Sequence, residues 1–168
     1  MKTQTKRKLL RKDAPSINKV MGYKNEAVVE RISKDLNLSK SESEELFNDM
    51  IRFLYIARST NIKPVSPPKM IDEAWHIFII YTQDYAKFCE KYFSSFIHHR
   101  PHRPEEKHGP EGGTNCRKLA QSFFGDDLSE NWKNPINGGC EDCNECNSSC
   151  KGFSCNSCSG DSREECCV

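Results

Sequence analysis

The stretch of sequence that decides the fold runs from residue 66 to residue 99 and reads SPPKMIDEAWHIFIIYTQDYAKFCEKYFSSFIHH. The prolines at its start forbid a helix that continues through them, and Ser66 is placed to cap the helix that follows. Apolar and aromatic side chains then recur at helical spacing and nearly encircle the predicted helix: Ile71, Trp75, Phe78, Ile79, Tyr81, Tyr85, Phe88, Cys89 and Tyr92. A helix that is apolar on most sides lies at the centre of a fold. We therefore expect one central helix over residues 68–92.

Helical patterns also precede this stretch. Residues 25–37 carry a short amphipathic pattern, and residues 40–58 carry one wide apolar stripe. Ser41 and Glu44 form a capping-box pair ahead of that stripe. Two helices are therefore expected upstream of the central one.

A further short helix is expected downstream, starting at Thr114 and stopped by Gly125. Trp132 is expected to pack back on the body. No alternating pattern typical of β-strands is present. The sequence thus predicts an all-α fold, a small bundle of three to five helices with an irregular cysteine-rich C-terminal tail.

The composition of the 168 residues limits the possible classes of protein. Hydrophobic residues make up 36% and charged residues 29%, with a mean hydropathy of −0.76, which allows one modest core. No apolar run approaches the roughly 20 residues of a membrane span, and no apolar region typical of a secretory signal follows the basic start. We therefore expect a cytoplasmic protein without membrane contact. Three parts are expected: a basic, flexible arm (1–22), a helical domain (23–135), and a cysteine-rich tail that binds metal or is disordered (136–168).

The start of the chain is strongly basic. Six lysines and arginines stand against one aspartate in the first 13 residues. Such a segment can contact nucleic acid. No aromatic residue is interleaved with these charges, which weakens the case for binding a single strand. A solvated terminus is the favoured interpretation, and nucleic acid is a less favoured partner.

A carboxylate–histidine pair on the central helix is the first candidate site. Asp72 and His76 are four residues apart and so share a helix face. Four of the five histidines follow within eleven residues, beginning with His98 and His99, and the chain can fold this segment back onto His76. We therefore predict a site for zinc or iron at Asp72, His76, His98 and His99. The alternative is a polar network that locks the loop against the helix.

The same stretch contains an Asp-x-x-Trp-His helix, a Tyr-x-x-Phe-Cys continuation and a His-His ending. These motifs lie at Asp72, Trp75, His76, Tyr85, Phe88, Cys89, His98 and His99. In them the chain resembles the glycine-rich domain-containing protein family, and the segment CRKLAQSFFGD (116–126) is similar to that family's following helix. The resemblance covers about residues 45–135. It implies one site containing His76, His98 and His99 and a Gly- and Cys-rich tail, but no reaction.

The cysteine-rich tail is the second candidate site. Eight of the ten cysteines lie in the last 29 residues, which favours a reducing compartment with thiols available for metal or redox chemistry. The candidate thiolate ligands are Cys140, Cys143, Cys146, Cys150, Cys155 and Cys158. The first four of these cysteines have the spacing of a bacterial ferredoxin run. An iron–sulfur cluster is nevertheless disfavoured, because only Phe153 offers it apolar shielding. Zinc suits two Cys-x-x-Cys pairs, and Cu(I) suits adjacent cysteines. The alternative is a disordered tail of reduced thiols.

Taken together, these patterns predict a metal-associated binding module, with zinc or a soft metal held by the tail and a His/Asp site in the helical body. An unidentified protein is the expected partner. One alternative is a metal-dependent hydrolase or oxidoreductase that uses Asp72, His76, His98 and His99. Another is a structural scaffold that displays the tail to a partner or a modifying enzyme. Catalysis is the less favoured interpretation, since no nucleophile motif is present.

Overall fold

The computed structural model describes residues 9–62, 65–100, 111–126 and 128–133, with the backbone alone for residues 111–115. Within these residues the chain forms six α-helices, one 3-10 helix and no strand. They are α2 (Ile17–Met21), α3 (Glu26–Leu36), α4 (Lys40–Ser59), α5 (Lys69–Ile80), α6 (Thr82–Phe93), α7 (Glu111–Phe124) and η1 (Glu130–Trp132). The expected all-α fold is confirmed, with six helices in place of three to five. Among the same residues, no helix combines the length and the apolar character that crossing a bilayer requires.

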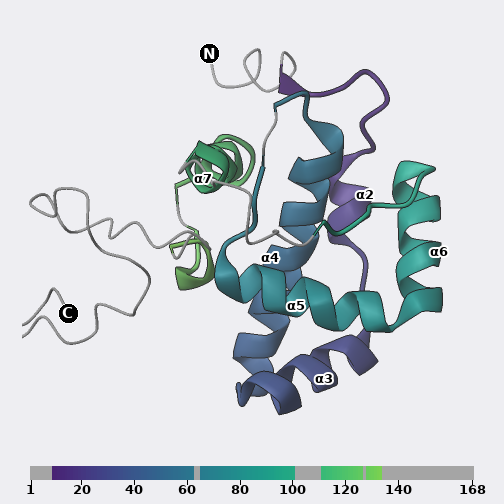
Figure 1. The fold of residues 1–168 in the computed structure, drawn as a ribbon, viewed down its shortest axis with the longest axis vertical. Helices are drawn as coiled ribbons and strands as arrows, with labels where there is room; N and C mark the ends of the chain where they lie inside the picture. Colours follow the sequence, from purple (N-terminus) through teal and green to yellow (C-terminus); the bar gives the residue numbers. More distant parts are fainter. Residues whose placement is uncertain (1–8, 63–64, 101–110, 127, 134–168) are drawn as a thin grey trace, which may run out of the picture.

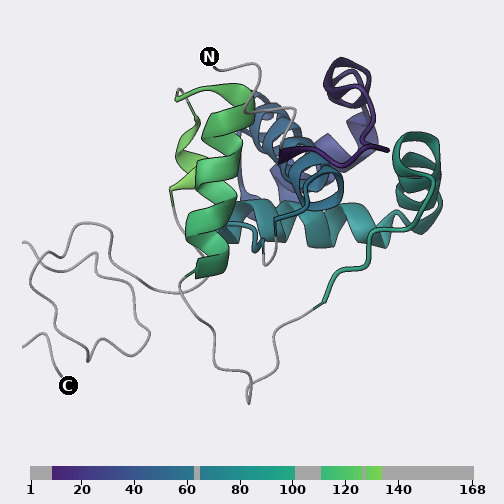
Figure 2. The same cartoon turned by 90° about the horizontal axis from the view of Figure 1, so that it is seen from above.

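Helix α4 lies at the centre of the fold, with α2, α3, α5 and α7 packed against it (Figures 1 and 2). Its 20 residues make it about 30 Å long, which is enough for several helices to share it. Its side chains are buried on more than one face, including Phe47, Phe53 and Tyr55. The helix predicted over residues 40–58 is confirmed, but this helix, not residues 68–92, occupies the centre.

The single helix expected over residues 68–92 is wrong, because the chain breaks at Tyr81 into α5 and α6. Tyr81 has φ −79° and ψ 62°, outside the helical region, and α6 leaves α5 at a sharp angle (Figure 1). The bend has a packing reason. In a straight helix Phe88 would lie about 15 Å farther along the axis than Phe78, whereas after the bend the two ring centroids are 5.5 Å apart in one core. There Phe78 packs edge-on against Tyr85 and Phe88.

The capping box of α4 uses Ser39 and Glu42, not the expected Ser41 and Glu44. Ser39 Oγ accepts a hydrogen bond from the Glu42 N–H, and the Glu42 carboxylate accepts one from the Ser39 N–H at 2.8 Å. The Ser-x-x-Glu pattern occurs twice, two residues apart, so the sequence pattern fits both registers. The folded chain uses the earlier one, and α4 starts at Lys40.

Helix α5 begins directly after Pro68, which is its N-cap residue and makes no side-chain cap. The expected cap, Ser66, therefore plays no such part. A hydrogen bond of 2.9 Å from the Asp72 N–H to the Pro68 carbonyl closes the first turn. The N-terminal end of a helix carries partial positive charge, so a carboxylate at Asp72 is stabilised there.

Part of the stretch expected as a flexible arm (1–22) packs on the body. Helix α2 lies against α4, and its Val20 is fully buried. Leu10 and Thr60 form an isolated antiparallel bridge. The apolar residues spaced through this stretch give it a buried side, so the folded body starts no later than residue 9.

The far end of the described chain is tied to α4. Helix α7 begins earlier than the expected Thr114, and Gly125 ends it as expected, with a left-handed φ of +97°. Trp132 is buried, which confirms that it packs back on the body. The fully buried carboxylate of Asp49 accepts hydrogen bonds from Ser129 and from two further side chains. These bonds fix the segment that ends in η1.

Candidate metal centre

Helix α5 and the segment after α6 bring three possible metal ligands together. One carboxylate oxygen of Asp72 lies 3.5 Å from His76 Nδ1, and the other lies 2.9 Å from His99 Nε2. One ligand atom from each residue lies within 4.8 Å of the other two. Asp72 and His76 are one turn apart on α5, as their spacing predicts, whereas His99 comes from 27 residues beyond Asp72. We call these three residues the Asp/His cluster.

The segment that carries His99 is held in place by Tyr85 of α6. The Tyr85 hydroxyl donates a hydrogen bond to the Ile97 carbonyl at 2.6 Å and accepts one from Trp75 Nε1 at 3.0 Å. Burial raises the pKa of Tyr85 well above its usual range, so the hydroxyl keeps the proton that it donates. Because Ile97 lies two residues before His99, these bonds place the imidazole beside α5.

Trp75 also supports the His99 ring directly. The two ring centroids are 4.4 Å apart with the rings inclined at 62°, and the indole also packs against Phe53 of α4. The His76 and His99 rings lie 4.3 Å apart. The core therefore fixes one side of the His99 imidazole, and Nε2 is turned toward Asp72.

The Asp/His cluster is open to solvent on one side. The side chain of His76 is 46% exposed, against 19% for Asp72 and 13% for His99. Asp72 and His99 thus form the buried side of the cluster and His76 the solvent side. A cation placed there would have protein ligands on one side and solvent on the other.

The expected ligand His98 is not part of the Asp/His cluster. Burial alternates along residues 96–99: Phe96 and His98 are exposed, whereas Ile97 and His99 are turned toward the body. The His98 ring lies against the Phe96 ring, with centroids 5.0 Å apart. The structure therefore brings together three of the four residues expected in this site.

The expected thiolate ligands lie outside the described residues: Cys140, Cys143, Cys146, Cys150, Cys155 and Cys158. The described cysteines, Cys89 and Cys116, are buried free thiols. Burial raises the pKa of both thiols, to about 12 for Cys116. Since the thiolate is the form that binds metal and attacks electrophiles, neither cysteine is suited to either task.

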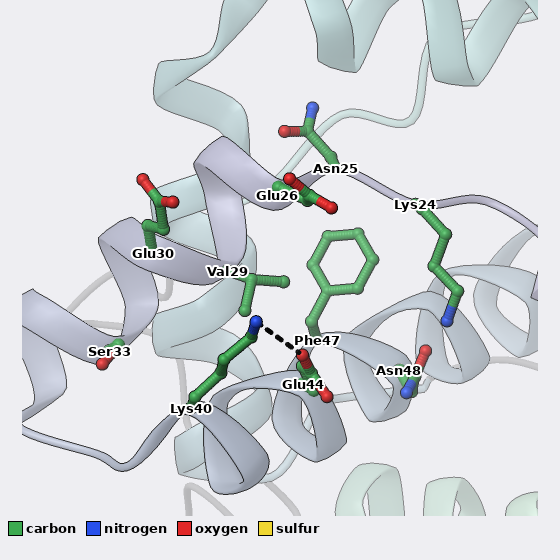
Figure 3. A pocket seen from close by; sticks show the side chains of 10 residues that line it. All are labelled: Lys24, Asn25, Glu26, Val29, Glu30, Ser33, Lys40, Glu44, Phe47 and Asn48. Atoms are coloured by element: carbon green, nitrogen blue, oxygen red, sulfur yellow. Dashed lines mark ion pairs between the residues drawn. The ribbon is translucent and has the colours of Figure 1, made fainter.

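A separate groove of about 550 Å³ lies between α3 and α4 (Figure 3). It is lined by Lys24, Asn25, Glu26, Val29, Glu30, Ser33, Lys40, Glu44, Phe47 and Asn48. The Phe47 ring forms its apolar floor, and Lys40 Nζ lies 3.9 Å from the Glu44 carboxylate at its edge. The groove shares no residue with the Asp/His cluster. Among the described residues, the cluster is the group whose His, Cys, Asp or Glu ligand atoms converge.

Residues 17–113, more than half of the chain, match the UCP032817-like family. The chain belongs to the UCP032817-like family. The resemblance to the glycine-rich domain-containing protein family is therefore wrong: it was carried by a few motif positions, and the longer match assigns a different family. Comparisons with curated proteins and with solved structures gave no match.

The UCP032817-like match contains the whole Asp/His cluster together with Trp75 and Tyr85, and it ends before the cysteine-rich tail. The name of the UCP032817-like family states no activity. The sequence placed Trp75 and Tyr85 among the apolar positions and among the motif positions of the resemblance, but the part that Tyr85 plays in holding Ile97 was missed. The signal that could have found this role is general: a buried Trp or Tyr needs a hydrogen-bond partner for its N–H or hydroxyl group.

Proposed function

We propose that this protein is a metal-binding module whose Asp/His cluster holds one divalent cation, with zinc as the preferred ion. The observation that carries the proposal is the convergence of Asp72, His76 and His99. Zinc binds imidazole nitrogen and carboxylate oxygen at about 2.0–2.2 Å, so the ligands of one tetrahedral ion stand about 3.3 Å apart. The contacts from His76 and His99 to Asp72, at 3.5 and 2.9 Å, are close to that spacing, although they reach different oxygens of the carboxylate. One ligand atom from each residue lies within 4.8 Å of the other two, so small side-chain rotations gather all three around one ion.

The position of His76 favours a cation over a polar network. The 2.9 Å contact between Asp72 and His99 is satisfactory as a hydrogen bond by itself. His76 Nδ1, at 3.5 Å, is too distant from Asp72 for a good hydrogen bond, yet it faces the same carboxylate. Two imidazoles turned toward one carboxylate are a ligand set that suits zinc.

Thiolate binding by the cysteine-rich tail is the second part of the proposal. Its support is the spacing of the pairs Cys140/Cys143 and Cys155/Cys158, which suits a tetrahedral thiolate site. In this account the helical body and the tail bind metal through different ligand types. The absorption spectrum of the cobalt-loaded protein distinguishes the two sites, because a thiolate ligand adds an intense charge-transfer band that imidazole and carboxylate ligands do not add.

The test is a zinc titration in competition with a chromophoric chelator. It uses the full chain with the eight cysteines of the tail replaced by serine, so that only the body offers ligands. We expect one zinc per chain. Asp72→Asn should lower the zinc affinity by more than about tenfold, because it removes the charged ligand. Glu73→Gln changes an exposed carboxylate on the same helix and should leave the affinity unchanged.

Absence of zinc uptake by the serine variant contradicts the site in the body. Equal losses for Asp72→Asn and Glu73→Gln also contradict it, since they indicate attraction to an acidic surface instead of a defined ligand set. The thiolate part is tested separately by the unmodified chain, which should bind more zinc than the serine variant.

A further inference from the structure

The Asp/His cluster supplies three protein ligands at the surface, whereas a closed zinc site takes four. We infer that two copies of this chain associate through zinc, and that each copy supplies His98 as the fourth ligand to the site of the other. The inference rests on the proposed function, because it needs zinc at Asp72, His76 and His99. It assigns a task to the exposed histidine that the cluster leaves unused.

His98 has the right position for such a ligand. It is exposed, and it lies on the outward side of the segment whose inward side carries His99. Consecutive Cα atoms are about 3.8 Å apart, so the His98 side chain leaves the backbone next to His99 of the three-residue site. It cannot close its own site, because the two side chains point to opposite sides of the segment.

A surface that carries both a donor and an incomplete site is self-complementary. In a two-fold dimer each contact occurs twice, with residue i of one copy touching residue j of the other and the reverse. One two-fold axis beside the 98–99 segment therefore completes two zinc sites at once. A second copy is thus the occupant that this surface fits.

Apolar side chains beside the cluster support the same contact. The large hydrophobic side chains exposed in the described part of the chain are Ile80, at 63%, and Phe96, at 48%. Ile80 lies one turn beyond His76 on α5, and Phe96 lies two residues before His98. Ile80 shares a face of α5 with His76, and Phe96 shares the outward side of its segment with His98, so a second copy seated on His76 and His98 removes apolar surface from water.

The test measures the mass of the tail-serine variant in solution, with and without zinc, by size-exclusion chromatography with light scattering. We expect about 19 kDa without zinc and twice that mass with one zinc per chain. His98→Ala should remain monomeric and should still bind zinc, more than about tenfold more weakly. Phe96→Ser should keep the zinc stoichiometry and weaken dimerisation by about tenfold. The exposed half of the Phe96 ring is then no longer available to be buried in the dimer interface.

A mixing experiment shows whether the ligands come from different copies. His98→Ala keeps the three-residue site and lacks the donor, whereas His99→Ala keeps the donor and lacks the site. Neither variant should dimerise with zinc alone, and their mixture should form a dimer that holds one zinc.

Two results overturn the inference and leave the proposed function standing. One is a wild-type site that binds one zinc in a monomer, which means that water fills the fourth position. The other is a zinc-dependent dimer that persists in His98→Ala. A chain that binds no zinc overturns the inference together with the proposed function.

Discussion

Replacing His99 by alanine is expected to lower the zinc affinity of the helical body by more than about a hundredfold. His99 is the least exposed of the three proposed ligands, and its ring contacts Trp75 and Asp72. Its removal leaves Asp72 and His76, two ligands on one helix face, as the remaining ligands from the body. The affinity is measured by chelator competition in the tail-serine variant.

The same substitution should cost a modest part of the stability without metal. It removes the hydrogen bond to Asp72, worth about 1 kcal/mol, together with the packing of the ring on Trp75. A thermal melt of the metal-free protein checks this value and guards against a loss of affinity caused by unfolding. Zinc should raise the melting temperature of the parent and not of His99→Ala. Unchanged zinc affinity in a folded His99→Ala protein would place the metal elsewhere.

Replacing Tyr85 by phenylalanine is expected to lower the free energy of unfolding by about 2–4 kcal/mol. The buried hydroxyl serves two groups, the Trp75 indole N–H and the Ile97 carbonyl, and both lose their partner. The control is Tyr81→Phe. The Tyr81 hydroxyl also donates to a backbone carbonyl, that of Ala27, but at an exposed position where water replaces the lost bond. Urea unfolding of the metal-free proteins measures both effects.

A second readout separates the positioning of His99 from general stability. Tyr85→Phe should lower the zinc affinity by about 10–100-fold, since the segment that carries His99 loses the hydrogen bond that joins the Ile97 carbonyl to α6. Tyr81→Phe should bind zinc as the parent does. Parental zinc affinity in a destabilised Tyr85→Phe protein would show that Tyr85 supports the fold without positioning the ligand.

The local parts of the fold follow from the sequence, and the parts set by distant contacts do not. Helical periodicity predicts α3 and α4 because each has a clear apolar face. The break at Tyr81 is not visible in that pattern, because the buried positions keep one helical register across Tyr81 and so fit a straight helix and a bent pair equally well. The choice between them depends on whether Phe78 and Tyr85 can reach one core, which is a tertiary property.

The candidate site divides in the same way. Asp72 and His76 are four residues apart, so helix geometry alone places them together. Neighbouring residues of an extended segment face opposite ways, so only one of His98 and His99 can join them. In the structure it is His99, which lies on the same side of the segment as the buried Ile97, and the Ile97 carbonyl accepts the hydrogen bond from Tyr85. That bond depends on the bend at Tyr81.

X-ray absorption at the zinc edge of the loaded tail-serine variant shows directly whether imidazole and carboxylate in the helical body bind zinc. We expect nitrogen and oxygen ligands at about 2.0–2.2 Å, with imidazole scattering that decreases in His76→Ala and in His99→Ala. A zinc spectrum without imidazole scattering, or one that neither substitution changes, would contradict this expectation.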